Sequence, residues 1–193
     1  MKYSENIREY INEEIRILNS LDPAMIEKGM QEIEAAYHRD GTIYIFGNGG
    51  SASTASHYTN DFNKGLSEHL EKKFRFVCLN ENMPTLMAVA NDFGYEEIFR
   101  YQLKGRLKPE DLVIGISGSG NSENVVNALE YAKENGVRTM SILGYSGGKC
   151  KAITDVSMHV AIDNMQISED LHMIFDHLMM TVFMRCWGIQ QEN

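Results

Sequence analysis

Five short apolar segments, separated by helical patterns, constrain the fold of this chain more than any other feature of its sequence. The segments lie at 42–46, 74–79, 111–116, 139–143 and 156–162. Short, nearly continuous β-prone runs of this kind are typical of strands buried on both faces. Helical patterns are expected at about 52–68, 84–105, 122–135 and 148–152, and a last helix at about 167–187. This alternation predicts a mostly parallel sheet with helices on both faces.

The first 40 residues predict two helices that stand outside this alternation. Apolar residues of the segment 7–18 follow three- and four-residue spacings, which indicates one apolar helix face. Asp22 and Pro23 then suit the N-cap and the first turn of a second helix. Because no linker, repeat or low-complexity segment interrupts the chain, we expect residues 1–193 to form one domain with 1–40 as a helical extension.

The charge balance does not favour nucleic acid as a partner. The chain has 18 Lys and Arg against 27 Asp and Glu, a formal net charge of −9, whereas nucleic-acid binders normally carry a basic patch. Small anions remain possible ligands, because backbone N–H groups bind phosphate without side-chain charge. Three widely spaced cysteines, no signal-peptide pattern and no long apolar stretch predict a cytoplasmic protein without a membrane span.

Glycine and serine gather in two loops that directly follow predicted strands. The first loop is 47–53 (GNGGSAS) and the second is 117–122 (SGSGNS). In open parallel sheets, ligands bind beyond the carboxyl ends of the strands. Glycine lets the backbone approach an anion closely, and the following helix offers unpaired N–H groups. With the hydroxyls of Ser117, Ser119 and Ser122, the second loop predicts a phosphate cradle without a lysine, although a tight turn in which Ser122 caps the helix is the simpler alternative.

Two other phosphate-binding motifs fit the sequence less well. A P-loop requires glycine followed by lysine and then serine or threonine, and the chain has no such triplet. Gly47-x-Gly49-x-x-Ala52 matches the dinucleotide fingerprint. However, the nearest acidic residue after the next strand, Glu81, lies well beyond the expected spacing of about 20 positions. A nucleotide-binding Rossmann protein is therefore a minor alternative, which titration with NAD(P) would test.

Histidines and carboxylates share faces on two of the predicted helices. His57 and Asp61 are four residues apart and therefore lie on one face. The last helix carries Glu169, His172, Asp176 and His177, of which Glu169 and His177 align across about two turns. A solvated face with charge pairs explains either helix alone. Two histidines with two carboxylates also suit zinc or another divalent metal and acid–base chemistry near neutral pH.

At the two loops, the sequence resembles the sugar isomerase (SIS) domain family, and within it the phosphoheptose isomerases. The likeness extends to the leading helices, to Asn91-Asp92-Phe93-Gly94 and to the last helix. It implies a flavodoxin-like three-layer α/β/α fold with a five-stranded parallel sheet. It also implies a phosphorylated sugar as ligand and a homotetramer with active sites at subunit interfaces.

The resemblance assigns substrate contacts to both loops and to the middle of the chain. These residues are Asn48, Gly49, Ser51, Ser117, Gly118, Ser119 and Ser122, with Asn82 and Asp92 as further contacts. Gly118 departs from the family, because relatives usually carry threonine there. The backbone N–H is kept at this position, but one hydroxyl donor is lost.

Four positions correspond to residues that line the family's active site and bind zinc in some members: His57, Asp61, Glu169 and His177. Both histidines match, whereas Asp61 replaces a glutamate and Glu169 a glutamine. The resemblance implies proton transfer between C1 and C2 through a cis-enediol, with His177 as the acid and Asp61 or Glu169 as the base. Asp61 is one methylene shorter than glutamate, and catalysis is sensitive to misplacement of about 1 Å. Glu169 adds a charge that would strengthen metal binding.

The resemblance implies a ketose–aldose isomerase without an organic cofactor, with or without one zinc ion per site. The expected reaction converts sedoheptulose 7-phosphate to D-glycero-D-manno-heptose 7-phosphate for lipopolysaccharide or capsule synthesis. One alternative is an isomerase of a different sugar phosphate. Another is a non-catalytic SIS module that senses sugar phosphates or associates with a replication initiator. Both substituted positions, Asp61 and Glu169, stay ionisable, which favours an enzyme.

Overall fold

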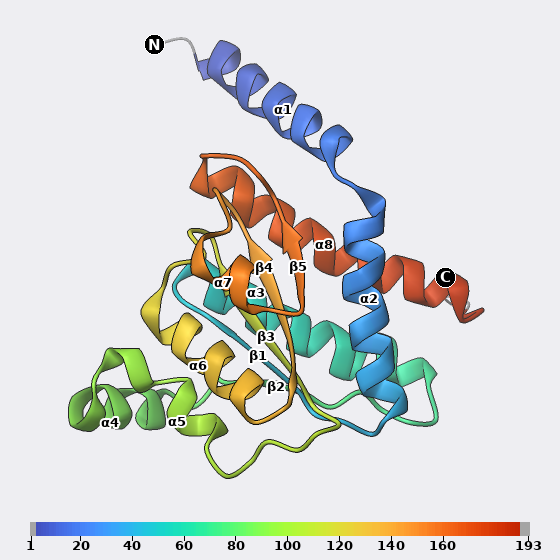
Figure 1. Ribbon diagram of the computed structural model, residues 1–193. Coiled ribbons are helices and arrows are strands. Elements are labelled where there is room, and N and C mark those ends of the chain that lie inside the picture. The colour runs from blue at the N-terminus through green and yellow to red at the C-terminus, as the bar shows by residue number, and fades with distance from the viewer. Residues whose placement is uncertain (1–2, 190–193) are drawn as a thin grey trace.

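A five-stranded, all-parallel sheet forms the centre of the computed structural model, which describes residues 3–189 (Figure 1). The strands are β1 (Ile43–Gly47), β2 (Phe76–Cys78), β3 (Leu112–Ser117), β4 (Arg138–Leu143) and β5 (Val156–His159). Their order in the sheet is β2-β1-β3-β4-β5, and every neighbouring pair is parallel. The expected flavodoxin-like sheet is therefore confirmed.

Eight α-helices flank or extend this sheet within the described residues. They are α1 (Tyr3–Ser20), α2 (Pro23–His38), α3 (Gly50–Asn60), α4 (Met83–Phe93), α5 (Arg100–Leu103), α6 (Glu123–Glu134), α7 (Gly148–Ile153) and α8 (Met165–Cys186). The start of α2 follows the sequence prediction, because the Asp22 carboxylate accepts a hydrogen bond from the backbone N–H of Ala24 at 2.9 Å. None of these helices is both long and apolar enough to cross a membrane.

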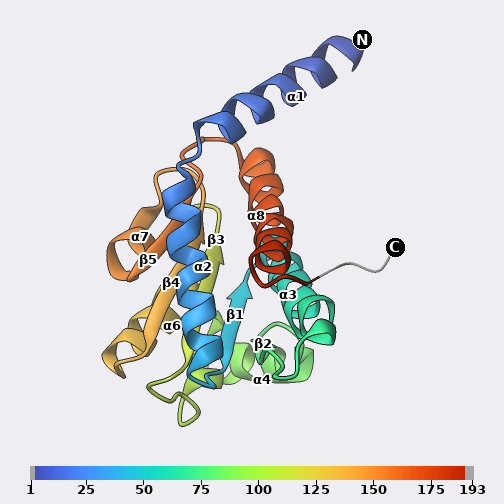
Figure 2. The same ribbon diagram turned by 90° about the vertical axis from the view of Figure 1, so that its right-hand side faces the viewer.

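Alternate residues of each central strand enter two hydrophobic cores, one on each face of the sheet. Ile43 and Ile45 of β1 pack with residues of α2, α3 and α8, whereas Tyr44 and Phe46 pack with residues of α4, α5 and α6. Figure 2 shows α3 and α8 on one side of the sheet and α6 and α7 on the other. Burial on both faces explains why the strands read as continuous apolar runs.

The first helix, α1, projects away from the body of the molecule, whereas α2 packs beside β5 (Figures 1 and 2). Four apolar side chains spaced four residues apart on α1 are exposed: Tyr3, Ile7, Ile11 and Ile15. The sequence therefore predicted both helices of the extension, but only the second of them covers the sheet.

Two of the expected long helices are interrupted. The segment 52–68 forms α3, then a π-helical segment over Asp61–Leu66 and a short 3₁₀ turn over Ser67–His69. Within the π segment, the Asn63 amide pairs with both backbone groups of Phe76 on the edge strand β2, at 2.8 Å each. The segment 84–105 is divided at Gly94, whose φ of +103° a helix cannot contain. Neither interruption has a helical-periodicity signal, because both depend on tertiary contacts or a single backbone angle.

Candidate active site

The two glycine- and serine-rich loops lie side by side, because the strands that precede them, β1 and β3, are neighbours in the sheet. Chain connections leave these two strands on opposite faces, toward α3 and α6. This is the position at which parallel α/β sheets bind ligands. The Asn48 and Asn124 amides join the first loop to the start of α6 through a reciprocal pair of hydrogen bonds at 2.9 Å each. Tyr95 adds a hydroxyl that donates to Asn48 Oδ1 at 2.8 Å.

Residues from both loops and from α8 line one cavity of about 130 Å³. Its wall consists of Asn48, Ser51, Ile116, Ser117, Gly118, Ser119, Ser122, Met165 and Glu169. The structure thus brings together six of the nine predicted substrate-binding residues. Gly49, at φ +55°, is the N-cap residue of α3 beside them.

The second loop, 117–122, which we call the serine loop, has hydrogen bonds within itself and packs closely against the loop after β4. The Gly120 N–H donates to Ser117 Oγ at 3.1 Å, and Ser117 Oγ lies 3.3 Å from Ser122 Oγ. Gly120 has φ +66°, and a Cβ there would lie 2.0 Å from the Gly147 carbonyl oxygen. Ser122 precedes α6 but makes no side-chain capping hydrogen bond. The structure therefore does not support the simpler alternative in which Ser122 only caps the helix.

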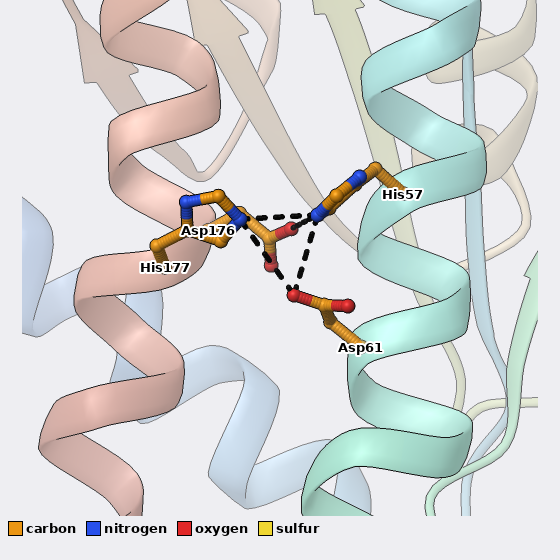
Figure 3. Close-up of side chains that lie close together, drawn as sticks. All are labelled: His57, Asp61, Asp176 and His177. Atoms are coloured by element: carbon orange, nitrogen blue, oxygen red, sulfur yellow. Dashed lines mark hydrogen bonds and ion pairs between the residues drawn. The ribbon is translucent and has the colours of Figure 1, made fainter.

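A second group of polar side chains lies between α3 and α8 (Figure 3). His57 comes from α3, Asp61 begins the π segment, and Asp176 and His177 come from α8. The Nε2 atoms of His57 and His177 are 3.0 Å apart. His57 Nε2 lies 3.4 Å from Asp61 Oδ2 and 3.9 Å from Asp176 Oδ2. His177 Nε2 lies 3.9 Å from Asp61 Oδ2. We call these four residues the histidine–aspartate cluster.

Glu169 lies outside this cluster, although the resemblance implies it as a metal ligand. Its carboxylate packs against Gly50 at the start of α3, where an added Cβ would lie 2.4–2.6 Å from carboxylate atoms. A negative charge there also suits the positive end of the α3 dipole. Glu169 lines the serine cavity. Asp176 instead occupies the position expected for Glu169, in a group of residues that could hold a metal ion. Helical spacing alone aligned Glu169 with His177 but did not distinguish these two environments.

Asp176 and His172 are one turn apart on α8, and both are fully buried. Within residues 3–189, none of their side-chain nitrogen or oxygen atoms has a hydrogen-bond partner. Burial, reinforced by the nearby Asp61 charge, raises the pKa of Asp176 from 3.8 to about 8. Burial also lowers the pKa of His172 to about 4. Sequence reasoning placed Asp176 on the right helix but could not find its burial, since spacing does not report the packing around one carboxyl.

Asn82 and Asp92 lie on the α4 side of the sheet and do not line the described cavity. The Asn82 side chain caps α4 by accepting a hydrogen bond from the Thr85 N–H at 3.1 Å. Asp92 accepts one from the Asn91 amide at 2.8 Å. Their assignment as substrate contacts stays a prediction.

In the metal-free protein, the raised pKa of Asp176 predicts that stability falls as pH rises. The unfolded chain releases this proton near pH 3.8, whereas the folded state holds it up to about pH 8. Folding therefore takes up a proton between these values, and the free energy of unfolding decreases with pH by at most about 1.4 kcal/mol per unit. The decrease ends above pH 8, where both states are ionised. The lowered pKa of His172 acts in the opposite direction, but mainly below its ordinary value of 6.5.

Urea unfolding in the presence of a chelator, from about pH 7 to about pH 9, measures this slope. Asp176→Asn keeps the side-chain size and removes the titration, so we expect a flatter profile than that of the unsubstituted chain. Parallel profiles for the two proteins would contradict the raised pKa.

Comparison with known proteins agrees with this architecture. The SIS domain model matches residues 3–144. Phosphoheptose isomerase from Helicobacter pylori strain P12 is 36% identical over 155 residues, covering 80% of each chain. Phosphoheptose isomerase from Leptospira biflexa is 32% identical over 186 residues, covering 94% of this chain and 95% of the relative. The solved structure of phosphoheptose isomerase from Neisseria gonorrhoeae has a TM-score of 0.85 at 26% identity, covering 93% and 97%.

The chain belongs to the SIS domain family, whose sheet and paired loops it shares. Within that family it belongs to the phosphoheptose isomerases, which are aldose–ketose isomerases. The family resemblance recognised from the two loops and the last helix is therefore confirmed.

Proposed function

We propose that this chain interconverts sedoheptulose 7-phosphate and D-glycero-D-manno-heptose 7-phosphate. The observation that carries the proposal is a small serine-lined cavity together with a histidine–aspartate cluster, because α3 and α8 contribute residues to both. The similarity to phosphoheptose isomerases over most of the chain supports the same reaction. The product would serve synthesis of a surface polysaccharide.

The sugar phosphate would be held by the serine loop. Ser117, Ser119 and Ser122 line one cavity with Gly118, and the N-terminus of α6 follows directly. Hydroxyl donors and a helix N-terminus bind phosphate without a positively charged side chain. This explains how a chain with net charge −9 can hold an anionic substrate.

The reaction requires one proton to move between carbons and a second between oxygens. Starting from the ketose, a base removes a proton from C1 while an acid protonates the C2 carbonyl oxygen, which forms the cis-enediol. Deprotonation of the C1 hydroxyl and protonation of C2 then yield the aldose. His177 is the proposed acid, and its imidazole is 59% exposed. Asp61 or Glu169 is the proposed base.

The zinc ion that the resemblance implies fits the donor set of the cluster. His57, Asp61 and His177 offer nitrogen and oxygen atoms within 4.8 Å of one another, and such ligands suit a divalent transition metal. When bound, the ion would polarise the oxygens at C1 and C2.

We also propose a homotetramer with active sites at subunit interfaces. The exposed apolar side chains of α1 support association, because a largely exposed apolar helix face is typical of an interface. An apolar groove of about 600 Å³ between α2 and α8 adds a second such surface, with Leu18, Ile26, Leu178 and Trp187 among its lining residues. Free Cys78, Cys150 and Cys186 support a cytoplasmic location.

Turnover of sedoheptulose 7-phosphate by the purified chain tests the proposed reaction. We expect saturable formation of the aldose, followed by proton NMR, and competition by inorganic phosphate. Parallel assays with zinc and with a chelator measure the metal dependence. Saturable sugar-phosphate binding without turnover would instead support a sensing module or another substrate. Binding of NAD(P) without sugar-phosphate binding would support the nucleotide-binding alternative.

A further inference from the structure

Asp176 is the one fully buried member of the histidine–aspartate cluster, and its carboxyl oxygens lack hydrogen bonds within residues 3–189. Its side chain is 0% exposed, and neither carboxylate oxygen accepts a hydrogen bond within the described residues. In Figure 3 the carboxylate extends from α8 toward His57 and Asp61. Burial of a carboxyl group without a hydrogen bond is costly, and the only ion-pair contact of Asp176 within the described residues is His57 Nε2 at 3.9 Å. A fully buried carboxyl group without a hydrogen bond, beside three potential metal ligands, therefore points to a cation that all four residues share.

The spacing of the donor atoms suits such a cation. Four ligands around tetrahedral zinc, at bond lengths of about 2.0–2.2 Å, lie about 3.3–3.6 Å from one another. The two imidazole Nε2 atoms are 3.0 Å apart, His57 and Asp176 are 3.9 Å apart, and all four ligand atoms lie within 4.8 Å of one another. Small side-chain rotations would bring all four atoms to the tetrahedral spacing. Two carboxylates would also balance the charge of a divalent ion.

Glu169 is held away from this position by its own contacts. Its carboxylate packs on Gly50, and it lines the cavity with Ser119 and Ser122. Glu169 and Asp176 are seven residues apart, so they lie near the same helix face but about two turns from each other. Asp176 and Glu169 of α8 thus have different neighbours: Asp176 lies beside the histidines, and Glu169 lies beside the serine loop.

We propose that Asp176, in place of Glu169, completes a divalent-metal site with His57, Asp61 and His177, and that Glu169 acts on the substrate. The functional meaning of this division rests on the proposed isomerase reaction. The metal site itself does not, because it is defined by binding alone.

Metal titration of three matched proteins tests the assignment. Each chain is freed of metal by a chelator and titrated with zinc by calorimetry, and cobalt replaces zinc for absorption spectroscopy. We expect the unsubstituted chain to bind one ion with the intense visible bands of tetrahedral cobalt. Asp176→Asn should weaken zinc binding by more than about 100-fold, because loss of a ligand exceeds loss of a supporting residue. Glu169→Gln, the matched control, should change it by less than about tenfold.

Turnover measured beside metal content separates the two carboxylates. Glu169→Gln should lose about 100-fold or more in kcat while it stays fully loaded with zinc, as expected for a group that moves a proton. Asp176→Leu is a second variant that is expected to fold even if Asp176→Asn does not, because an apolar side chain suits the buried position. Circular dichroism of both Asp176 variants in chelator should match that of the unsubstituted chain.

Three outcomes would overturn the assignment. They are normal zinc affinity in both folded Asp176 variants, loss of zinc by Glu169→Gln, and no zinc binding by the unsubstituted chain. The proposed function fails separately. Zinc binding that depends on Asp176, without any sugar turnover, would keep the metal site and reject the isomerase. Turnover by a chain that binds no metal would reject the metal site and keep the isomerase.

Discussion

His177→Ala is expected to lower kcat for sedoheptulose 7-phosphate by at least about 10²-fold, because the substitution removes both the proposed acid and a proposed metal ligand. The His177 ring faces His57 at 3.0 Å between Nε2 atoms and is 59% exposed, so its removal leaves no hole in either core. The loss should therefore be catalytic and not structural. Steady-state kinetics with an unfolding curve for the same preparation measures both effects.

His69→Ala is the matched control for this substitution. His69 lies in the 3₁₀ turn after the π segment, where its ring pairs with exposed Glu68 at 3.6 Å. Its removal should change kcat by less than about twofold, as for a surface side chain outside the site. Equal losses in the two variants would show that the histidine–aspartate cluster is not the catalytic group.

Gly120→Ala is expected to weaken the serine cavity's affinity for phosphate and to destabilise the fold. An alanine Cβ at this position would lie 2.0 Å from the Gly147 carbonyl oxygen, so one of the two loops must move. The movement would break the Gly120 N–H bond to Ser117 and displace the serine hydroxyls. We expect KM to rise more than about tenfold, which corresponds to at least 1.4 kcal/mol of lost binding.

Gly136→Ala isolates the conformational part of this effect. Gly136 has φ +72°, close to the +66° of Gly120, but no atom lies within 4 Å of an added Cβ. Its substitution should lower the free energy of unfolding by about 1–2 kcal/mol, because alanine is disfavoured in the left-handed backbone region. We expect KM to stay unchanged. Inorganic phosphate inhibition and urea unfolding of both variants provide the measurement. An unchanged KM in Gly120→Ala would exclude the serine loop as the phosphate site.

The sequence was sufficient to predict the sheet and the loops of this fold, because their signals are local. Strands buried on both faces produce apolar runs such as 111–116, and β3 follows within one residue at Leu112–Ser117. The glycines and serines of 117–122 indicated a cradle because each residue type acts through its own backbone or hydroxyl. Neighbouring loops then followed from the neighbouring positions of β1 and β3.

The cluster was predicted only in part, because its membership depends on packing between helices. His57 and Asp61 share a face by spacing, and His177 followed from the resemblance. The burial of Asp176 comes from the contact of α8 with α3, which periodicity does not contain. The contact of Glu169 with Gly50 also arises between segments more than a hundred residues apart. The π segment at Asp61 escaped prediction for the same reason.

The division of labour between backbone and side chains has an evolutionary consequence. The serine loop is built from one continuous stretch between β3 and α6, whereas the histidine–aspartate cluster depends on side chains of α3 and α8. In the proposed arrangement, substitutions near Asp176 and His177 of α8 would alter the chemistry at the reacting end of the sugar, while the serine loop would still hold the phosphate. Because the serine loop and the histidine–aspartate cluster come from different segments, a lineage could change its sugar, or replace catalysis by sensing, while the sheet stays the same.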